Sequence, residues 1–509
     1  MSELFKTAAI RRIEARALAA VPPGTLMARA ADAVAQATAC VARGLSPGRP
    51  ILALVGPGNN GGDALLAALR LREWGFRCRA LSLTATAPQA GLAADAAAVW
   101  QRCAAAGLVP QVACDEQTVE QALAEAPIVI DGLFGIGQSR PLQGMAATLA
   151  RAVGRRALPV VAVDVPSGID ADRGTIIGDG APDAVAIRAA VTVTMIADKP
   201  GLHTGAALNH VGRVVVAPLG IADAVAAEPP DGRLFDAEAA VQRIPERPHD
   251  SHKGRFGHVL IYGGDTGLRG AALLAARSAQ ACGAGKTSIA SPAGPLFDPG
   301  QPQLMTADSA PRFDSFDVVV IGCGLGTSAV AAARLAEALA DARALVIDAD
   351  ALTLIAQQPA LAQALAQSEA PKLLTPHPLE AARLLGVPAA AVQADRIAAA
   401  QTLAARLRCT VLLKGAGSVA ADPQGRWSII DAGGAALASG GTGDVLAGMA
   451  GALFAQGVDA VAAACLAAWA HGTAADRWQS PRRWSGGLNP AQLPALARDV
   501  LAGVNEGSE

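Results

Sequence analysis

Short runs of β-branched and aliphatic residues alternate with long alanine- and leucine-rich runs along this chain. No other feature of the sequence restricts its fold as strongly. The strand-like runs of the first half are residues 51–55, 80–84, 128–130, 160–165 and 191–195. A helix-like run at 64–74 follows the first of them. Strands separated by helices are typical of βαβ units and a mainly parallel sheet, so we expect an α/β fold.

The alternation restarts after an interruption, which indicates a second α/β domain. The interruption is residues 226–249, where prolines and mixed charge replace the periodicity. The strand-like runs beyond it are residues 259–262, 287–290, 318–321, 344–347 and 410–413. The chain has 509 residues, enough for two domains. We predict a first domain over 1–228, a linker over 229–245 and a second, distinct domain over 246–509.

Composition excludes several classes of partner. The chain has 42 Lys and Arg against 44 Asp and Glu, whereas a chain that neutralises nucleic-acid phosphates shows a basic excess. No run of about 18 apolar residues is present, so we expect no membrane span. The eight cysteines form no CxxC pair, which predicts neither a zinc site nor a disulfide framework. The N-terminus lacks a signal-peptide pattern, and we expect a cytoplasmic protein.

The first glycine-rich turn follows the run 51–55. Gly56, Gly58 and Gly61 satisfy GxGxxG between a strand and a helix, where backbone N–H groups can hold a phosphate. The second strand, 80–84, lacks the acidic residue that a dinucleotide fold places there. Three polar side chains nearby indicate further ligand or cation contacts: Asn59, Asn60 and Asp63. A plain strand-to-helix turn, with Asp63 at the helix N-terminus, is the alternative.

Two aspartates follow the next strands. Asp131 comes after 128–130 and Asp164 after 160–163, and open α/β sheets bind ligands at the carboxyl ends of their strands. A single strand-end aspartate is commonly a turn or capping residue. Three polar, glycine-rich loops at three strand ends favour a ligand site.

In the second half, Gly440, Gly441 and Gly443 precede Asp444 and an expected helix. Backbone N–H groups and a helix N-terminus at this point would hold an anion, with Asp444 placed for acid–base work. Ordinary capping turns remain the alternative, as do solvated or capping roles for Asp348 and Asp350. The segment CGAGKTS at 282–288 imitates a P-loop, but it lies between a helix and a strand in the wrong order, and a P-loop NTPase is rejected.

Four segments of the first half, GPGNNGGD, VIDGLFGIGQSRPL, VDVPSGID and ADKPGLHTG, resemble in their order the NAD(P)HX epimerase domain, which has a Rossmann-like, doubly wound fold. That family interconverts the R and S forms of hydrated NADH or NADPH. The resemblance implies a potassium ion held by Asn60, Asp131 and Ser167. Inverting a hydroxyl-bearing carbon requires proton or water traffic, so Asp164 is our acid–base candidate, with Lys199 as an assistant. The implied substrate contacts are Asn59, Asn60, Gly61, Gly62, Asp63, Gly135, Ile136, Gly137, Gln138, Ser139, Arg140, Pro141 and Asp164.

Segments of the second half, among them GGDTGLRGA, GCGLGTS, LTPHPLE, LKGAGS and SGGTGD, resemble the ADP-dependent NAD(P)HX dehydratase, which has a ribokinase-like fold. The resemblance implies removal of water from the S epimer, with ADP as co-substrate and magnesium. We expect Asp444 to accept the substrate's hydroxyl proton during phosphoryl transfer. The implied substrate contacts are Ala271, Gly324, Gly326, His377 and Asp444. The implied nucleotide contacts are Lys414, Gly415, Ala416, Gly417, Ser418 and Gly443.

Two other functions stay open at this point. One is a ribokinase-type kinase for a vitamin or sugar alcohol, fused to a nucleotide-binding domain. The other makes the first domain a non-catalytic binding module, although the intact Asn60, Asp131, Asp164 and Ser167 argue against it. His377 alone would more often be a turn residue, and its TPHP motif favours the ligand role. The family also implies a homo-oligomer.

Overall fold

The computed structural model describes residues 2–43, 48–86, 94–181, 183–480, 482 and 484–503. The chain forms two compact units that divide between Gly232 and Arg233, with Ser2 grouped with the second. Most of the stretch expected as a linker, 229–245, belongs to the second unit. It contains β9 (Gly232–Phe235) and α8 (Ala237–Val241), and Phe235 is fully buried in the second unit's core. The sequence did not predict these two short elements, because prolines and mixed charge interrupt the periodicity at 226–249.

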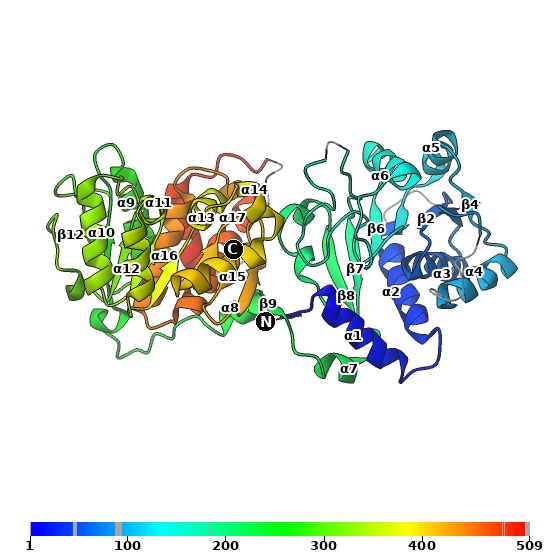
Figure 1. The fold of residues 1–509 in the computed structure, drawn as a ribbon, viewed down its shortest axis with the longest axis horizontal. Helices are drawn as coiled ribbons and strands as arrows, with labels where there is room; N and C mark the ends of the chain where they lie inside the picture. Colours follow the sequence, from blue (N-terminus) through cyan, green and yellow to red (C-terminus); the bar gives the residue numbers. More distant parts are fainter. Residues whose placement is uncertain are drawn as a thin grey trace. The chain divides into compact units, whose positions relative to one another are not determined.

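The first unit contains a seven-stranded sheet and seven helices within the described residues (Figure 1). Its strands are β2 (Ile51–Val55), β3 (Cys78–Ser82), β4 (Gln111–Val112), β5 (Val129–Gly132), β6 (Val160–Val163), β7 (Val191–Met195) and β8 (Arg213–Ala217). Its helices are α1 (Thr7–Leu18), α2 (Thr25–Ala42), α3 (Asn59–Glu73), α4 (Ala94–Ala105), α5 (Glu116–Glu125), α6 (Gly144–Arg156) and α7 (Ala222–Ala226).

The first sheet has the order β4-β3-β2-β5-β6-β7-β8, and every pair is parallel. The chain builds outward from β2 through β3 to β4, and then returns to the other side of β2 with β5. This reversal creates a topological switch point between β2 and β5, where doubly wound folds bind ligands. The predicted Rossmann-like architecture is therefore confirmed.

Both faces of this sheet are buried, as its nearly continuous apolar strands require. Alternate residues of β2 show the division: Ile51, Ala53 and Val55 pack in the cluster formed with α1 to α4, whereas Leu52 and Leu54 pack in the cluster formed with α5 and α6. The two helical layers hold the strands in a fixed position, so that their carboxyl ends present the loops at a defined place.

Helix α3 begins at Asn59, five residues before the expected start at residue 64. Gly61 therefore lies in the first turn of the helix, and a Cβ there would come within 2.1 Å of the Gly56 carbonyl oxygen. Close packing of this turn on the end of β2 needs glycine at both positions. The GxGxxG pattern thus gives a tight strand-to-helix junction with Asn59 and Asn60 at the helix start.

The second unit contains one large sheet and the remaining helices. The strands of this sheet are β1 (Ser2–Leu4), of which only Ser2 is grouped with this unit, β9, β10 (His258–Tyr262), β11 (Lys286–Ala290), β12 (Met305–Thr306), β13 (Val318–Ile321), β14 (Leu345–Ile347), β15 (Lys372–Leu374), β16 (Thr410–Leu413), β17 (Val419–Ala421) and β18 (Trp427–Ile430). Its helices are α8, α9 (Arg269–Ala281), α10 (Ala329–Asp341), α11 (Ala349–Gln357), α12 (Pro359–Gln367), α13 (Pro378–Leu385), α14 (Ala389–Ala394), α15 (Arg396–Leu407), α16 (Thr442–Ala455), α17 (Ala460–Gln479) and α18 (Leu493–Leu501).

The second sheet has the order β1-β9-β18-β17-β16-β15-β14-β13-β10-β11-β12. Neighbouring strands pair in parallel from β16 through β15, β14, β13, β10 and β11 to β12. Strand β17 pairs antiparallel with both β16 and β18. The order reverses between β10 and β13, which gives this unit its own switch point. Helices α8, α9, α16, α17 and α18 cover one face around a core rich in alanine. Among the described residues, no helix has the length and apolar character needed to cross a membrane.

Candidate active sites

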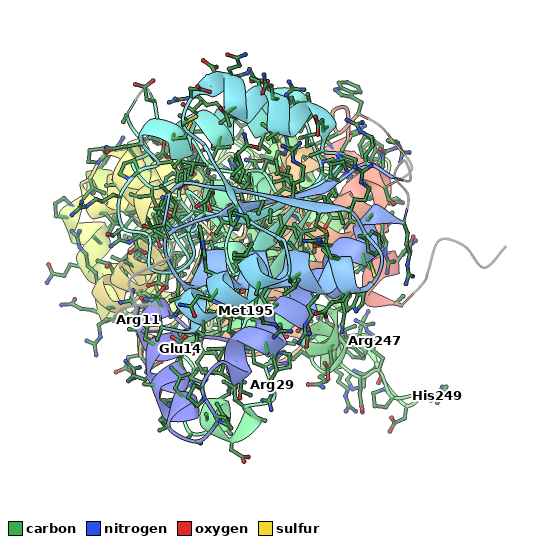
Figure 2. All side chains as sticks on the ribbon, turned by 90° about the vertical axis from the view of Figure 1, so that its right-hand side faces the viewer. Arg11, Glu14, Arg29, Met195, Arg247 and His249 are labelled. Carbon is green, nitrogen blue, oxygen red and sulfur yellow. The ribbon has the colours of Figure 1, made fainter. Side chains whose placement is uncertain are left out.

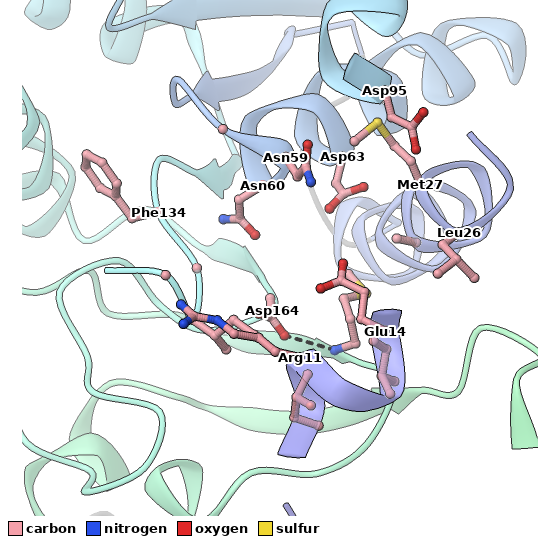
Figure 3. Close-up of a pocket in the computed structure, with 18 of the residues that line it drawn as sticks. Arg11, Glu14, Leu26, Met27, Asn59, Asn60, Asp63, Asp95, Phe134 and Asp164 are labelled. Atoms are coloured by element: carbon pink, nitrogen blue, oxygen red, sulfur yellow. Dashed lines mark hydrogen bonds between the residues drawn. The ribbon is translucent and has the colours of Figure 1, made fainter. Parts of the chain in front are cut away.

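A cavity of ≈ 400 Å³ opens at the carboxyl ends of the first unit's strands (Figure 3). Residues after β2, β5 and β6 form one part of its wall, and helices α1 and α2 supply another. Its lining includes Arg11, Glu14, Leu26, Met27, Asn59, Asn60, Asp63, Asp95, Gly135, Ile136, Gly137, Gln138, Asp164, Met195, Ile196 and Leu219. The cavity lies at the switch point, where the sheet topology predicts a ligand.

One carboxylate oxygen of Asp164, Oδ2, faces this cavity, and the other, Oδ1, is bound by groups of the protein. The Met195 backbone N–H donates to Oδ1 over 3.1 Å, and Lys199 Nζ lies 2.9 Å from the same oxygen. Oδ2 lies 3.3 Å from the place that a Cβ on Gly135 would occupy, beside the cavity-lining loop. The fixed Oδ1 orients the carboxylate and leaves Oδ2 for a ligand.

Lys199 is fully buried, with no exposed side-chain surface. Besides the contact with Asp164, its Nζ donates to Thr194 Oγ1 at 2.7 Å and to the Met195 carbonyl oxygen at 3.0 Å. The ammonium is thus surrounded by acceptors of the protein itself. This geometry favours a positioning role for Lys199, acting on the substrate through Asp164.

Backbone strain is concentrated around the same cavity. Among the described residues, six non-glycine residues have positive φ, and three of them line it: Asp164 (φ 67°), Ile196 (φ 73°) and Leu219 (φ 52°). Such conformations cost about 1–3 kcal/mol each and persist only where the surrounding structure enforces them. A branched residue such as Ile196 is the most unusual of the three. Strain of this kind is typical of functional sites.

Three further carboxyl groups line this cavity, Glu14 from α1, Asp63 from α3 and Asp95 from α4 (Figure 3). Figure 2 labels Glu14 beside Arg11, which lies on the same helix. Burial raises the pKa of Asp63 well above its usual value, and the negative charges of Asp164, Glu14 and Asp95 add to the shift. Burial, followed by the charge of Asp164, also raises the pKa of Glu14. Sequence reasoning did not identify Glu14, because nothing in the mixed-charge pattern of α1 distinguishes this acid from a solvated one.

The structure brings together most, but not all, of the predicted substrate contacts of the first unit. The predicted residues that line the cavity are Asn59, Asn60, Asp63, Gly135, Ile136, Gly137, Gln138 and Asp164. Gly61 and Gly62 are buried in the packing of α3, where Gly62 approaches Met27 and Ala96. Ser139 and Arg140 are exposed, and Pro141 packs against Gly178.

The residues expected to hold potassium lie around the loop that follows β5. Asp131 is fully buried, and its carboxylate accepts hydrogen bonds from the Ser167 N–H (2.8 Å), the Ser167 hydroxyl (2.7 Å) and the Leu133 N–H (3.2 Å). Burial raises its pKa to about 6. The buried Asn60 Nδ2 has no hydrogen-bond partner among the described residues. The Asp131 carboxylate, the Ser167 hydroxyl and the Asn60 side-chain carbonyl offer oxygen atoms, the ligands that a hard monovalent cation takes, whereas Asn60 Nδ2 can only donate a hydrogen bond.

In the second unit, Lys414 and Asp348 form an ion pair at the ends of β16 and β14, the two strands on either side of β15. Lys414 Nζ donates to Asp348 Oδ1 over 2.7 Å, and the Asp348 side chain is 2% exposed. The negative charges of Asp348 and Glu380 outweigh burial and raise the pKa of Lys414. Asp348 is therefore not solvated, and although it occupies the N-cap position of α11, its side chain makes no capping hydrogen bond. Asp350 accepts a hydrogen bond from the Gly326 N–H over 2.8 Å and holds the neighbouring glycine loop.

Asp444 lies in the first turn of α16, beside this ion pair. The helix begins at Thr442, before Asp444 and not after it as expected, and Gly441 adopts φ 97° at its start. A Cβ on Gly443 would lie 3.4 Å from Lys414 Nζ and 3.7 Å from Asp348 Oδ2. Burial, and then the charge of Asp348, raise the pKa of Asp444 to about 6. An acid–base group and a helix N-terminus thus share one place, as the sequence predicts.

Two glycine loops meet at the second switch point, after β10 and β13. The Gly264 N–H donates to the Cys323 carbonyl over 3.0 Å, and the Asp265 N–H donates to the Gly324 carbonyl over 2.7 Å. A Cβ on Gly324 would lie 3.1 Å from the Cβ of Ala271. Ala271 and Gly324, both expected to contact substrate, are therefore neighbours. Gly326, the third such residue, lies two residues further along the same loop as Gly324.

His377 has a structural role in addition to any ligand role. Its Nδ1 accepts hydrogen bonds from the Leu379 and Glu380 N–H groups and caps α13, as the turn alternative predicts. Its Nε2 lies 3.3 Å from Glu380 Oε1, and 46% of the side chain is exposed. Burial raises the pKa of Glu380 to about 7. Only the Nε2 edge is left to contact a substrate.

The loop 414–418, expected to bind nucleotide, rests on a buried arginine that sequence reasoning missed. Arg396 is 1% exposed, at the start of α15. Its Nη2 donates to the carbonyl oxygens of Leu413 (3.3 Å), Lys414 (3.3 Å) and Gly417 (3.5 Å). Burial lowers its pKa to about 10. Because Arg396 donates to three carbonyl oxygens, it fixes the shape of this loop.

The fold is that of a two-domain α/β protein, with carboxyl groups gathered at the strand ends of each sheet. Residues 259–495 match the family described as NAD(P)H-hydrate dehydratase, and residues 23–201 match the family described as YjeF-related protein N-terminus. The chain belongs to the family of bifunctional NAD(P)H-hydrate repair enzymes. It is 34% identical to the Coxiella burnetii enzyme over 94% of this chain and 95% of that one. It is 35% identical to the Escherichia coli enzyme over 89% and 84%.

Among solved structures, the chain resembles an ADP/ATP-dependent NAD(P)H-hydrate dehydratase from Bacillus subtilis that was co-crystallised with ATP and Mg²⁺. The match has 28% identity and a TM-score of 0.48, and covers 54% of this chain and 99% of the other.

Proposed function

We propose that the chain repairs hydrated NADH and NADPH in two consecutive steps, one in each unit. The first unit interconverts the R and S epimers, and the second removes water from the S epimer at the expense of ADP. The family of the chain supports this division. The observation that carries it is a carboxyl group at the strand ends of each unit: Asp164, held by Met195 and Lys199, in one, and Asp444, beside the Lys414–Asp348 ion pair, in the other.

In the first unit, Asp164 exchanges protons with the substrate through Oδ2, while Met195 and Lys199 hold Oδ1. Inversion of a carbon that bears a hydroxyl requires the C–O bond to break and form again, and a fixed carboxylate accelerates the accompanying proton transfers. Asn60, Asp131 and Ser167 would hold a potassium ion. The ion would supply a fixed positive charge beside the loop that follows β5.

In the second unit, Asp444 accepts the proton of the substrate hydroxyl while that oxygen attacks the terminal phosphorus of the nucleotide. The N-terminus of α16 and the Lys414 ammonium face the transferred phosphoryl group and stabilise its negative charge. Phosphate then departs with the C–O bonding electrons. Hydroxide is a much poorer leaving group, which is why the hydroxyl is phosphorylated first. Loss of a ring proton then restores the dihydropyridine. Asp348, whose Oδ2 faces Gly443, would supply a carboxylate oxygen to a magnesium ion, which would neutralise phosphate charge.

The same proposal takes the nucleotide to be ADP, bound by the loop 414–418 and Gly443. The eight cysteines are free thiols, which suits a reducing cytoplasm. The homo-oligomer stays a prediction, which light scattering of the purified protein would test.

The deciding experiment offers the purified protein a mixture of R and S hydrated NADH with ADP and magnesium, and follows the recovery of NADH absorbance. We expect the whole mixture to be repaired faster than spontaneous epimerisation allows. The Asp164→Asn variant should repair quickly only the S fraction, and Asp444→Asn should repair neither. Formation of a stable phosphorylated product from ATP, with no NADH, would favour the kinase alternative. Activity with ATP and none with ADP would contradict the nucleotide assignment.

A further inference from the structure

The N-terminal helix α1 contributes an acidic side chain to the first unit's cavity. Within α1, Thr7–Leu18, Glu14 is the only acid, and it lines the same cavity as Asp164 and Asp63. Figure 3 shows the three carboxyl groups turned toward one space from three separate elements. Glu14 is therefore part of the site, although it lies 150 residues before Asp164 in the chain.

We propose that Glu14 is a second catalytic residue of the first unit, which donates a proton to the departing hydroxyl while Asp164 accepts one from the incoming water. This inference rests on the proposed epimerase function.

The two carboxyl groups occupy different surroundings, as an acid–base pair requires. Asp164 is ion-paired with Lys199 at 2.9 Å and accepts a backbone N–H. Glu14 shares its part of the cavity with apolar side chains, including Leu26 and Met27. Its carboxyl group loses hydration there and faces the charge of Asp164, and both effects favour the protonated form. One cavity thus brings together a carboxylate held in an ion pair and a second carboxyl group whose pKa is raised.

Asp63 is a less suitable proton donor, because a donor must also give up its proton. The charges that act on Asp63 are those of Asp164, Glu14 and Asp95, all negative, and they add to the effect of burial. Glu14 has Arg11 and Lys199 nearby, whose positive charges partly stabilise its ionised form. Positive charge near Glu14 therefore helps this group to release a proton, whereas the charges that act on Asp63 all oppose its ionisation.

The proposed step balances in atoms and electrons. Hydration of an enamine places the hydroxyl on a carbon bonded to the ring nitrogen. As the C–O bond breaks, its electron pair goes to oxygen, Glu14 supplies a proton to form water, and the nitrogen lone pair forms a C=N bond. Water then adds to the other face of the planar carbon, the C=N electrons return to nitrogen, and the proton of the water passes to Asp164. The neighbouring carboxylates stabilise the cationic intermediate, and exchange with solvent resets the two protons.

The test uses the full chain, because its second unit reports on folding. Purified R epimer is offered to Glu14→Gln, Glu14→Asp, Asp164→Asn and the unaltered protein, with ADP and magnesium, and NADH recovery is followed with epimerisation rate-limiting. The same preparations receive purified S epimer, which needs only the second unit. Glu73→Gln is the matched control, since Glu73 is a half-exposed acid at the end of α3 that pairs with Arg70.

We expect Glu14→Gln to lower kcat on the R epimer by about 100-fold or more, as loss of a general acid does, with KM little changed. Glu14→Asp, which keeps the acid, should restore much of the rate, and Glu73→Gln should match the unaltered protein. All variants should dehydrate the S epimer at the unaltered rate. A Glu14→Gln variant that converts the R epimer normally, while Asp164→Asn does not, would overturn the inference alone. Failure of the unaltered protein to convert the R epimer would overturn the proposed function and the inference together.

Discussion

The ammonium of Lys199 lies 2.9 Å from Oδ1 of Asp164, and no part of the Lys199 side chain reaches solvent. Removing one member of a buried pair leaves the other charge uncompensated, which costs about 3–5 kcal/mol. We expect Lys199→Met to lower the free energy of unfolding by that order and to slow R-epimer conversion strongly. The double variant Lys199→Met/Asp164→Asn should be more stable than Lys199→Met alone, because no unpaired charge remains. Denaturant unfolding of the four proteins of this cycle measures the difference. Equal stability of the single and double variants would contradict the pairing.

The dehydration step should depend on pH through Asp444. Burial and the charge of Asp348 raise the pKa of Asp444 to about 6, so the fraction in the base form declines as the pH falls through that value. The rate on S epimer should therefore fall as the pH is lowered through about 6. Asp348→Asn removes the negative charge and leaves Lys414 free to face Asp444, so this limb should move to lower pH. A pH–rate profile of both proteins is the measurement, and an unmoved limb would assign it to another group.

Arg396 should control nucleotide binding without touching the nucleotide. In Arg396→Met, the carbonyls of Leu413, Lys414 and Gly417 lose their donor, which costs about 1–3 kcal/mol of stability and loosens the loop. We expect the KM for ADP to rise while the KM for the S epimer stays near its original value. Arg498→Met is the control, because Arg498 is an exposed arginine paired with Asp499. A rise in both KM values would indicate general damage to the second unit.

Potassium should stabilise the first unit through Asp131. A ligand at ten times its Kd stabilises a protein by about 1.4 kcal/mol, so thermal unfolding should shift upward as potassium replaces a bulky organic cation at constant ionic strength. Asp131→Asn, which keeps the shape of the side chain and removes its charge, should lose that shift. The rate of R-epimer conversion should follow the same dependence. An equal shift in both proteins would place the ion elsewhere.

Sequence reasoning succeeded where a site depends on local geometry. Glycine and aspartate at a strand end determine a turn by their own conformational preferences, and the parallel topology brings such turns to one edge of a sheet. For this reason Asn60, Asp131 and Asp164 could be placed together in advance, as could the loop that contains Asp444.

It failed where a residue acts through distant packing. The charge pattern of α1 does not reveal that Glu14 faces a cavity, and an arginine near the start of a helix gives no sign that it supports a loop 17 residues later, as Arg396 does. The start of α3 was placed too late, because the glycine-rich, polar segment before residue 64 was interpreted as a turn. The packing of this segment on Gly56 outweighs the low helix propensity of its glycines. The antiparallel β17 and β18 were missed because strands of three and four residues are too short to show a period.

The left-handed conformation of Ile196 in the cavity wall has a consequence for protein engineering. Glycine adopts such a conformation without steric cost, so the folded chain would be relaxed by a smaller residue there. Sites of this kind are where thermostability and catalytic rate conflict, because relief of strain also releases the backbone that holds a reacting group in place. Here the neighbouring Met195 N–H aims the carboxylate of Asp164. A search for hardier variants of this enzyme should therefore leave the segment after β7 unaltered and begin on the exposed helices.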